Sequence, residues 1–198
     1  PVKEANCLAE AGHEVFFVTV LQTVELTDRD RETLDDRVTL IPAVDLRTTN
    51  RNSLNKFLVR LGRKFGQKLM TVFGIETRFS VCHAPGRLLK ACASLDCDLY
   101  IGHIEAGLWV GRELSERGYT VAFDIEDWHS RDGLPGAQKQ FPQKLVASLE
   151  RFAVKHGAYA TTTSVPLAEA LGEAYESNPP TVIRNVFPQS ETDTIDGQ

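Results

Sequence analysis

The stretch DLYIGHIEAGLWVGRELSERGYTVAFDIEDWHS, residues 98–130, contains the pattern that decides the fold. Its first part (98–104) is apolar and indicates a buried strand, residues 105–117 follow a helical pattern, and residues 119–124 indicate a second strand. Two parallel strands need a long crossover between them, and a helix of this length provides it. We therefore predict a strand–helix–strand unit with parallel strands in this part of the chain.

The same alternation extends in both directions from this unit. On the amino-terminal side we expect a helix (2–11) ending at Gly12, a strand (15–21), a short strand (38–41) closed by Pro42, and helices at 53–72 and 86–94. On the carboxyl-terminal side we expect a helix (141–156), a strand (158–163), a helix (166–175) opened by Ser164, and a last strand (181–184). This order predicts a Rossmann-like three-layer α/β/α domain with a mostly parallel sheet over residues 1–188, followed by a tail or linker at 189–198.

Composition narrows the function classes. The chain has 198 residues, 42% of them hydrophobic, and a net charge of −5. The apolar content excludes general disorder, and the acidic excess argues against a nucleic-acid partner. No apolar run approaches the roughly 20 residues of a membrane-spanning helix, and the first residues lack a signal-peptide layout. We expect a cytoplasmic protein.

The cysteines do not form a metal-binding pattern. They are Cys7, Cys82, Cys92 and Cys97, and no two of them make a C-x-x-C pair. The simplest interpretation is that these cysteines are small buried hydrophobic residues of a protein in a reducing compartment. We therefore expect no metal, no cofactor and no disulfide framework.

Polar residues follow two of the predicted strands at the edge where parallel sheets bind ligands. His103 ends the first strand of the central unit, and Glu105 begins the helix after it. His103 is either a ligand for a substrate hydroxyl or a histidine satisfied by nearby backbone. Glu105 is either part of a binding site or an ordinary first-turn acid that complements the helix dipole.

The second strand end is denser in polar groups. Asp124, Glu126, Asp127, Trp128 and His129 lie within six residues. Neighbouring carboxylates raise one another's pKa, so one of them could act as a base, and an indole ring offers a face on which a sugar can stack and an N–H that can orient it. A plain acidic loop is the alternative, while the spacing of the acids matches no known metal cage. We expect this loop and His103 to share one crevice.

A basic island stands out in this acidic chain. Residues 46–75 contain no acid and carry Arg47, Arg51, Lys56, Arg60, Arg63, Lys64 and Lys68. A solvated helix face over the core is the simplest explanation. Docking of Arg60, Arg63, Lys64 and Lys68 to an anionic membrane surface is the functional alternative. Nucleic-acid binding ranks third among these interpretations.

Several stretches together resemble the N-terminal half of a two-Rossmann (GT-B) glycosyltransferase, most similar to family 4. They are KEANCLAEAGHEVFFVTV (3–20), DLYIGHIEAG (98–107), VAFDIEDWHS (121–130), LERFAVKHGAYATTTS (149–164) and VIRNVFP (182–188). The resemblance implies an acceptor-binding domain that lacks the family's first strand. It also implies that a second domain, absent from this chain, holds the nucleotide-sugar donor.

The resemblance assigns roles to the polar residues at the strand ends. Asp124, Glu126 or His129 would be catalytic, and His103, Glu105, Asp127 and Trp128 would bind a sugar or lipid-linked acceptor. The product would be a polysaccharide or glycolipid, and this chain alone would be inactive. Two alternatives stay open. One is a non-catalytic glycan- or protein-binding module. The other is a fragment of a UDP-sugar epimerase, suggested by the motif HIEAGL at 103–108.

Overall fold

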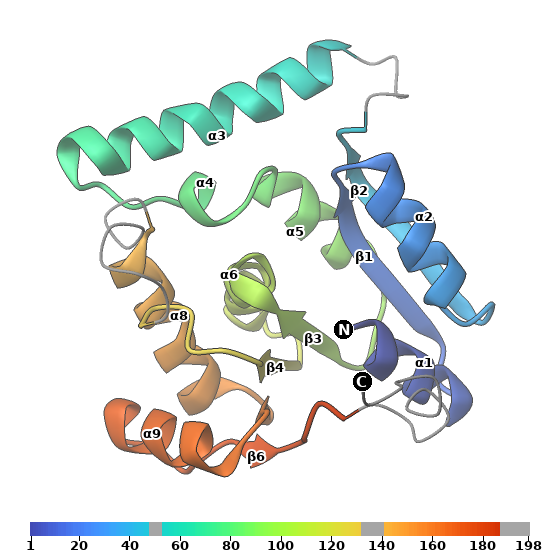
Figure 1. The fold of residues 1–198 in the computed structure, drawn as a ribbon, viewed down its shortest axis with the longest axis vertical. Coiled ribbons are helices and arrows are strands. Elements are labelled where there is room, and N and C mark those ends of the chain that lie inside the picture. Colours follow the sequence, from blue (N-terminus) through green and yellow to red (C-terminus); the bar gives the residue numbers. More distant parts are fainter. Residues whose placement is uncertain (48–52, 132–140, 187–198) are drawn as a thin grey trace, which may run out of the picture.

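The protein has a mixed α/β, Rossmann-like fold in which all paired strands are parallel. A computed structural model describes residues 1–47, 53–131 and 141–186 (Figure 1). The predicted fold class is therefore confirmed. The predicted tail at 189–198 and Arg51 of the basic island lie outside the described residues.

The strands form two groups. β1 (Val15–Leu21) pairs with β2 (Val38–Asp45), and a second sheet has the order β3 (Tyr100–His103), β4 (Val121–Ile125), β5 (Ala160–Thr162), β6 (Thr181–Val182). No pairing between β1 and β3 joins the two groups within the described residues. In the larger sheet, His103 stands opposite Asp124, and Asp124 stands opposite Thr161. This register brings the polar ends of neighbouring strands together.

The helices cover these strands. α1 (Val2–Glu10) and α5 (Pro85–Ala93) pack on β1 and β2, α6 (Ile104–Ser115) packs on β3 and β4, and α8 (Gln143–His156) lies between α6 and α9 (Val165–Tyr175). α2 (Val24–Thr33), α3 (Ser53–Phe73) and α4 (Arg78–Val81) complete the described set, and α3 runs along one margin of the molecule, at the top of Figure 1. Among the described residues, no helix is both long enough and apolar enough to cross a bilayer.

The main core surrounds β4. Phe123 and Ile125 of this strand are fully buried, against Leu108 and Leu114 of α6 and Leu149 of α8. Each such side chain contributes about 1.5–3 kcal/mol through its removal from water. The strand whose end carries the acidic loop therefore lies at the centre of the main core.

The predicted end of the second strand at Pro42 is wrong. β2 continues to Asp45, and the pairing shifts register opposite Thr19 and Val20. Proline has no backbone N–H for a strand ladder, but β2 is an edge strand, and edge strands and bulges tolerate this loss. The charge-mixed stretch 25–37, for which the sequence allows a solvated loop or a short helix, is helical as far as Thr33, as part of α2.

Two glycines let α6 start directly against β3. A methyl group at Gly102 would lie 2.6 Å from the carbonyl oxygen of Gly107, and one at Gly107 would lie 3.0 Å from the carbonyl carbon of Gly102. The backbones of the strand and the helix therefore touch. This contact brings the first turn of α6, with Glu105, close to the strand end that carries His103.

We expect Gly102→Ala to lower the free energy of unfolding by about 1–3 kcal/mol, because the methyl group must push the helix backbone away from the strand. Gly86→Ala is the matched control, since nothing lies within 4 Å of the methyl group that it would add to α5. Urea denaturation of both variants measures the difference. An equal effect of the two substitutions would contradict the close contact.

Candidate functional site

The turn between β3 and α6 is strained. Ile104 has a φ of 51°, in the left-handed region that β-branched residues avoid. Such a conformation costs about 1–3 kcal/mol and persists only where the surrounding structure imposes it. The turn separates two polar residues that face different partners: His103 faces Asp124, and Glu105 faces His129.

His103 lies among three carboxylates. Its Nε2 is 2.7 Å from Glu4 Oε2 of α1, and its Nδ1 is 3.2 Å from Asp124 Oδ2 and 4.0 Å from Glu126 Oε1. Nδ1 is buried and is not aligned for a hydrogen bond with any protein atom. Coulombic attraction does not require this alignment, so the cluster favours a positively charged imidazole.

The pKa values agree with this charge state. Burial by itself would lower the pKa of His103, but the carboxylates of Asp124 and Glu4 outweigh it and raise the pKa to about 9. Burial would raise the pKa of Asp124, but interactions with His103 and Thr161 lower it below its usual value. Thr161 donates its hydroxyl to Asp124 Oδ1 at 2.6 Å. At neutral pH the pair therefore consists of an imidazolium and a carboxylate.

This charge state limits the chemistry of the cluster. A protonated His103 can donate hydrogen bonds and neutralise negative charge, but it cannot accept a proton. Potential ligand atoms of Glu4, His103 and Asp124 lie within 4.8 Å of one another. A metal ion there would have to displace the imidazole proton first, because the metal needs the nitrogen lone pair.

A buried glutamate holds the loop that follows β4. Glu150 of α8 has no exposed surface, and its carboxylate accepts hydrogen bonds from the Ser130 backbone N–H at 3.0 Å, the Ser130 hydroxyl at 2.5 Å and the Tyr175 hydroxyl at 2.6 Å. Glu150 was not among the residues predicted for the site. The helical periodicity could have indicated a buried acid here, because Glu150 shares the apolar face of its helix with Val146, Leu149 and Ala153.

Trp128 is partly engaged by the protein. Its indole N–H donates to the Tyr175 hydroxyl at 3.3 Å, and the Arg131 guanidinium lies 4.2 Å from the centre of its ring. The N–H that we expected to orient a sugar is therefore already in use. A sugar that stacks on this ring would have to share it with Arg131.

An open pocket of about 430 Å³ lies at this edge of the sheet. It is formed by the loop after β4 and the start of α9, and it is lined by Glu126, Asp127, Trp128, Arg131, Thr163, Ser164 and Leu167. A second hollow, of about 660 Å³, lies at the other end of α9 and is lined by Gly172, Glu173, Glu176, Ser177, Asn178 and Pro179. We favour the smaller pocket, because it lies at the carboxyl ends of the strands and next to the charged cluster.

The structure brings most of the predicted site residues to this edge. His103, Asp124 and Glu126 form one cluster, and His129 Nδ1 lies 3.7 Å from Glu105 Oε1 beside it. Asp127 is exposed on the pocket rim. The two strand ends lie side by side as expected, but of the predicted site residues only Glu126, Asp127 and Trp128 line the pocket. The catalytic and binding roles of all these residues stay predictions.

No protein-family model matches this chain, and no curated protein matches it.

His103 makes the stability of the protein depend on pH. A histidine with a raised pKa stabilises the fold fully below its unfolded pKa of 6.5, and this contribution disappears as the pH rises through about 9. We expect wild type to exceed His103→Gln by about 3 kcal/mol in unfolding free energy at pH 6. The difference should vanish near pH 10, as measured by urea denaturation.

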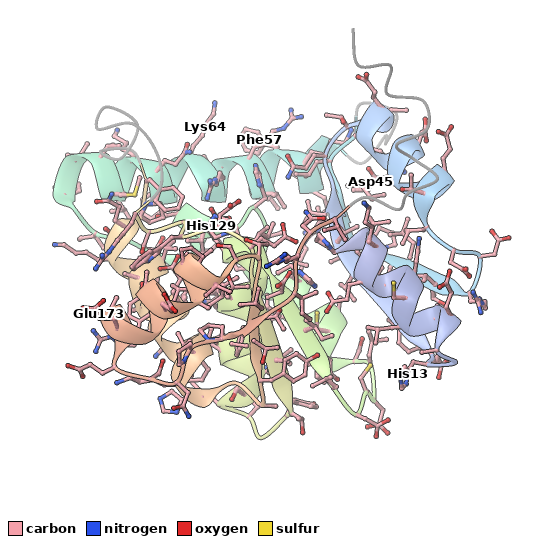
Figure 2. The ribbon with its side chains drawn as sticks, turned by 60° about the horizontal axis from the view of Figure 1, so that its bottom comes forward. His13, Asp45, Phe57, Lys64, His129 and Glu173 are labelled. Atoms are coloured by element: carbon pink, nitrogen blue, oxygen red, sulfur yellow. The ribbon has the colours of Figure 1, made fainter. Side chains whose placement is uncertain are left out.

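The control for this experiment is His13→Gln. His13 is exposed between α1 and β1, away from the site (Figure 2). Its substitution should leave the pH profile of stability unchanged. A constant difference between wild type and His103→Gln across the range would rule out the proposed charge pair.

Removal of the Glu150 carboxylate should destabilise the protein strongly. Glu150→Ala leaves the Ser130 N–H and hydroxyl and the Tyr175 hydroxyl without their acceptor, so we expect a loss of about 3 kcal/mol or more. Glu150→Gln keeps one acceptor oxygen and should lose less. Glu169→Ala, an exposed acid on α9, should stay within about 0.5 kcal/mol of wild type in the same denaturation experiment.

Proposed function

We propose that this chain is the acceptor-binding part of a glycosyltransferase, which transfers a sugar from a nucleotide-sugar to a polysaccharide or glycolipid acceptor. The observation that carries the proposal is the charged His103–Asp124 pair at adjoining strand ends, next to an open pocket beside Trp128. A second domain would hold the nucleotide-sugar, and this chain would supply the acceptor side of the site.

Glu126 is the best candidate for the base that activates the acceptor. Its carboxylate lines the pocket and is partly exposed, with Oε1 3.5 Å from the Pro1 amino group and 4.0 Å from His103 Nδ1. In Asp124, by contrast, both oxygens are within hydrogen-bond distance of a partner, His103 or Thr161. The acceptor hydroxyl would give its proton to Glu126 while its oxygen bonds to the anomeric carbon. The bond from that carbon to the nucleotide diphosphate breaks, and the diphosphate leaves with the bonding electrons.

His129 is the second candidate base. Glu105 lies close enough to orient its imidazole, as a carboxylate does in other acid–base pairs. Asp124 would then be a positioning residue that keeps His103 protonated. The imidazolium of His103 would donate a hydrogen bond or stabilise negative charge that develops during transfer. Trp128 and Asp127 on the pocket rim would contact the acceptor.

The proposed place of action is the cytoplasm, at the inner face of the plasma membrane. Two features support this location: the cysteines are free thiols, and α3 carries basic residues suited to the negatively charged cytoplasmic leaflet.

The test uses the protein at the length that its gene encodes, a panel of nucleotide-sugars and a lipid-linked or polysaccharide acceptor. Glu126→Gln and His129→Ala are compared with wild type, and the variant that removes the base should lose about 10²–10⁴-fold in turnover. Glu173→Gln, in the second hollow, should keep full activity (Figure 2). Full turnover in both site variants would overturn the proposal, and a loss in Glu173→Gln alone would move the site to the other hollow.

Asp124→Asn tests the positioning role. Without this carboxylate the pKa of His103 should fall toward its ordinary value of 6.5. If turnover requires the imidazolium, the alkaline limb of the pH–rate profile should then move to lower pH. A uniform loss of turnover with an unmoved profile would indicate a merely structural role for Asp124.

A non-catalytic glycan-binding module is the second candidate. It is favoured by the fact that His103 and Asp124 already satisfy each other's charge, which a static binding surface permits. Calorimetric titration with glycans, together with no turnover of any nucleotide-sugar, would support it over the enzyme.

A further inference from the structure

α3 turns its apolar side away from the rest of the protein. Six large apolar side chains on this side are between 51% and 67% exposed: Leu54, Phe57, Leu58, Leu61, Phe65 and Val72. They lie on one face of the helix, because residues three, four or seven positions apart project from the same side. This apolar stripe therefore faces outward and does not pack over the core. Phe73 and Ile75, at and just beyond the end of the helix, extend the exposed apolar surface.

A different face of α3 contacts the body of the protein, and this contact fixes the direction of the stripe. Val59 and Met70 are each 7% exposed on this face. Gly66 lies between them, and a methyl group there would meet the Phe79 side chain at 2.6 Å. Because the helix touches the α4 segment so closely, it cannot roll to bury the apolar stripe.

Arg63 belongs to the inner face as well. Its guanidinium donates to the Phe79 carbonyl oxygen at 3.0 Å, and burial lowers its pKa. Arg63 therefore differs from the other three residues of the predicted membrane-docking set, because its guanidinium is turned toward α4. Its charge serves the attachment of α3 to α4.

The other basic residues of that set border the exposed stripe. Arg60, Lys64 and Lys68 follow one another at intervals of four residues and are all exposed. Figure 2 shows Phe57 and Lys64 on the side of α3 that points away from the strands. Residues 46–75 contain no acid, although the whole chain has a net charge of −5. The positive charge is thus concentrated beside the apolar stripe.

We propose that this outer face of α3 binds the surface of an anionic lipid bilayer. The helix axis would lie parallel to the bilayer, with the apolar side chains about 5–10 Å deep at the boundary between headgroups and acyl chains. Arg60, Lys64 and Lys68 would contact acidic headgroups. Monomeric soluble proteins rarely leave such a continuous apolar surface without a partner.

The charges favour a bilayer over a second copy of the chain. Two copies that met through this stripe would bring Arg60, Lys64 and Lys68 of each close to those of the other, with no acid between residues 46 and 75 to compensate. An anionic membrane supplies negative charge along the whole length of the helix. The inference does not depend on sugar transfer, and it can be tested without a nucleotide-sugar.

The experiment measures vesicle flotation of the chain. One set of vesicles contains phosphatidylcholine with about one third phosphatidylglycerol, and the other contains phosphatidylcholine alone. We expect binding to the acidic vesicles only, with loss at high salt. The joint substitution of Arg60, Lys64 and Lys68 by Gln should weaken binding about 100-fold, since each charge near the surface contributes about fivefold. The double variant Phe57→Gln/Leu61→Gln keeps the charge of the wild-type protein and should lose binding to the acidic vesicles.

Matched controls separate this surface from general effects. Lys90→Gln, Arg117→Gln and Lys155→Gln remove the same charge from exposed positions on other parts of the surface, and Val165→Gln with Ile183→Gln removes exposed apolar side chains elsewhere. Both control variants should bind acidic vesicles like wild type. Circular dichroism and thermal unfolding establish that every variant is folded.

Any one of several outcomes would overturn the proposal. The first is equal binding to both kinds of vesicle, and the second is unchanged binding of the Phe57/Leu61 variant. The third is that wild type sediments as a dimer and the Phe57/Leu61 variant as a monomer, while neither protein binds vesicles. A Phe57→Trp variant provides a fluorescent probe on this face. If α3 inserts into the bilayer, the added indole should show blue-shifted fluorescence that brominated lipids quench. A lack of quenching would count equally against insertion. None of these results depends on the turnover experiment, so the glycosyltransferase proposal and this one can fail separately.

Discussion

The parallel register between β3 and β4 is the constraint on which the candidate site depends. It sets His103 opposite Asp124 at the edge of the sheet where both strands end. The two side chains then share a partly buried space, in which their attraction is stronger than in water. Glu4 from α1 and Thr161 from β5 complete the arrangement, so four elements that are distant in sequence meet at one charged pair.

The close contact of Gly102 with Gly107 and the strained backbone at Ile104 also help to form the site. Together they let the chain turn from strand to helix within one residue, so that Glu105 emerges beside His129 while His103 faces the neighbouring strand. On the other side of the site, the buried Glu150 holds the acidic loop through Ser130 and Tyr175. The loop is therefore anchored from beneath, and its outer residues are left for contact with a ligand.

The outer face of α3 illustrates how an amphipathic pattern can be ambiguous. The spacing of its apolar residues is equally suited to a helix packed on a core and to a helix lying on another surface. Which case applies depends on the face that the neighbouring segment occupies. Here the Phe79 region meets Gly66 and Arg63, and the apolar stripe is left outside.

Local patterns in the sequence determined the alternation of strands and helices, the parallel class of the fold, the N-cap at Ser164 and the position of polar residues at two strand ends. These features depend on interactions between residues that are near one another in the chain, such as helical periodicity and capping. The tertiary structure alone decided that Glu4 reaches His103, that Glu150 anchors the loop, that Trp128 is engaged by Tyr175 and Arg131, and that α3 exposes its apolar face. Each of these depends on which distant segments pack together, and the close packing of backbones and buried charges selects that arrangement from many that local patterns allow.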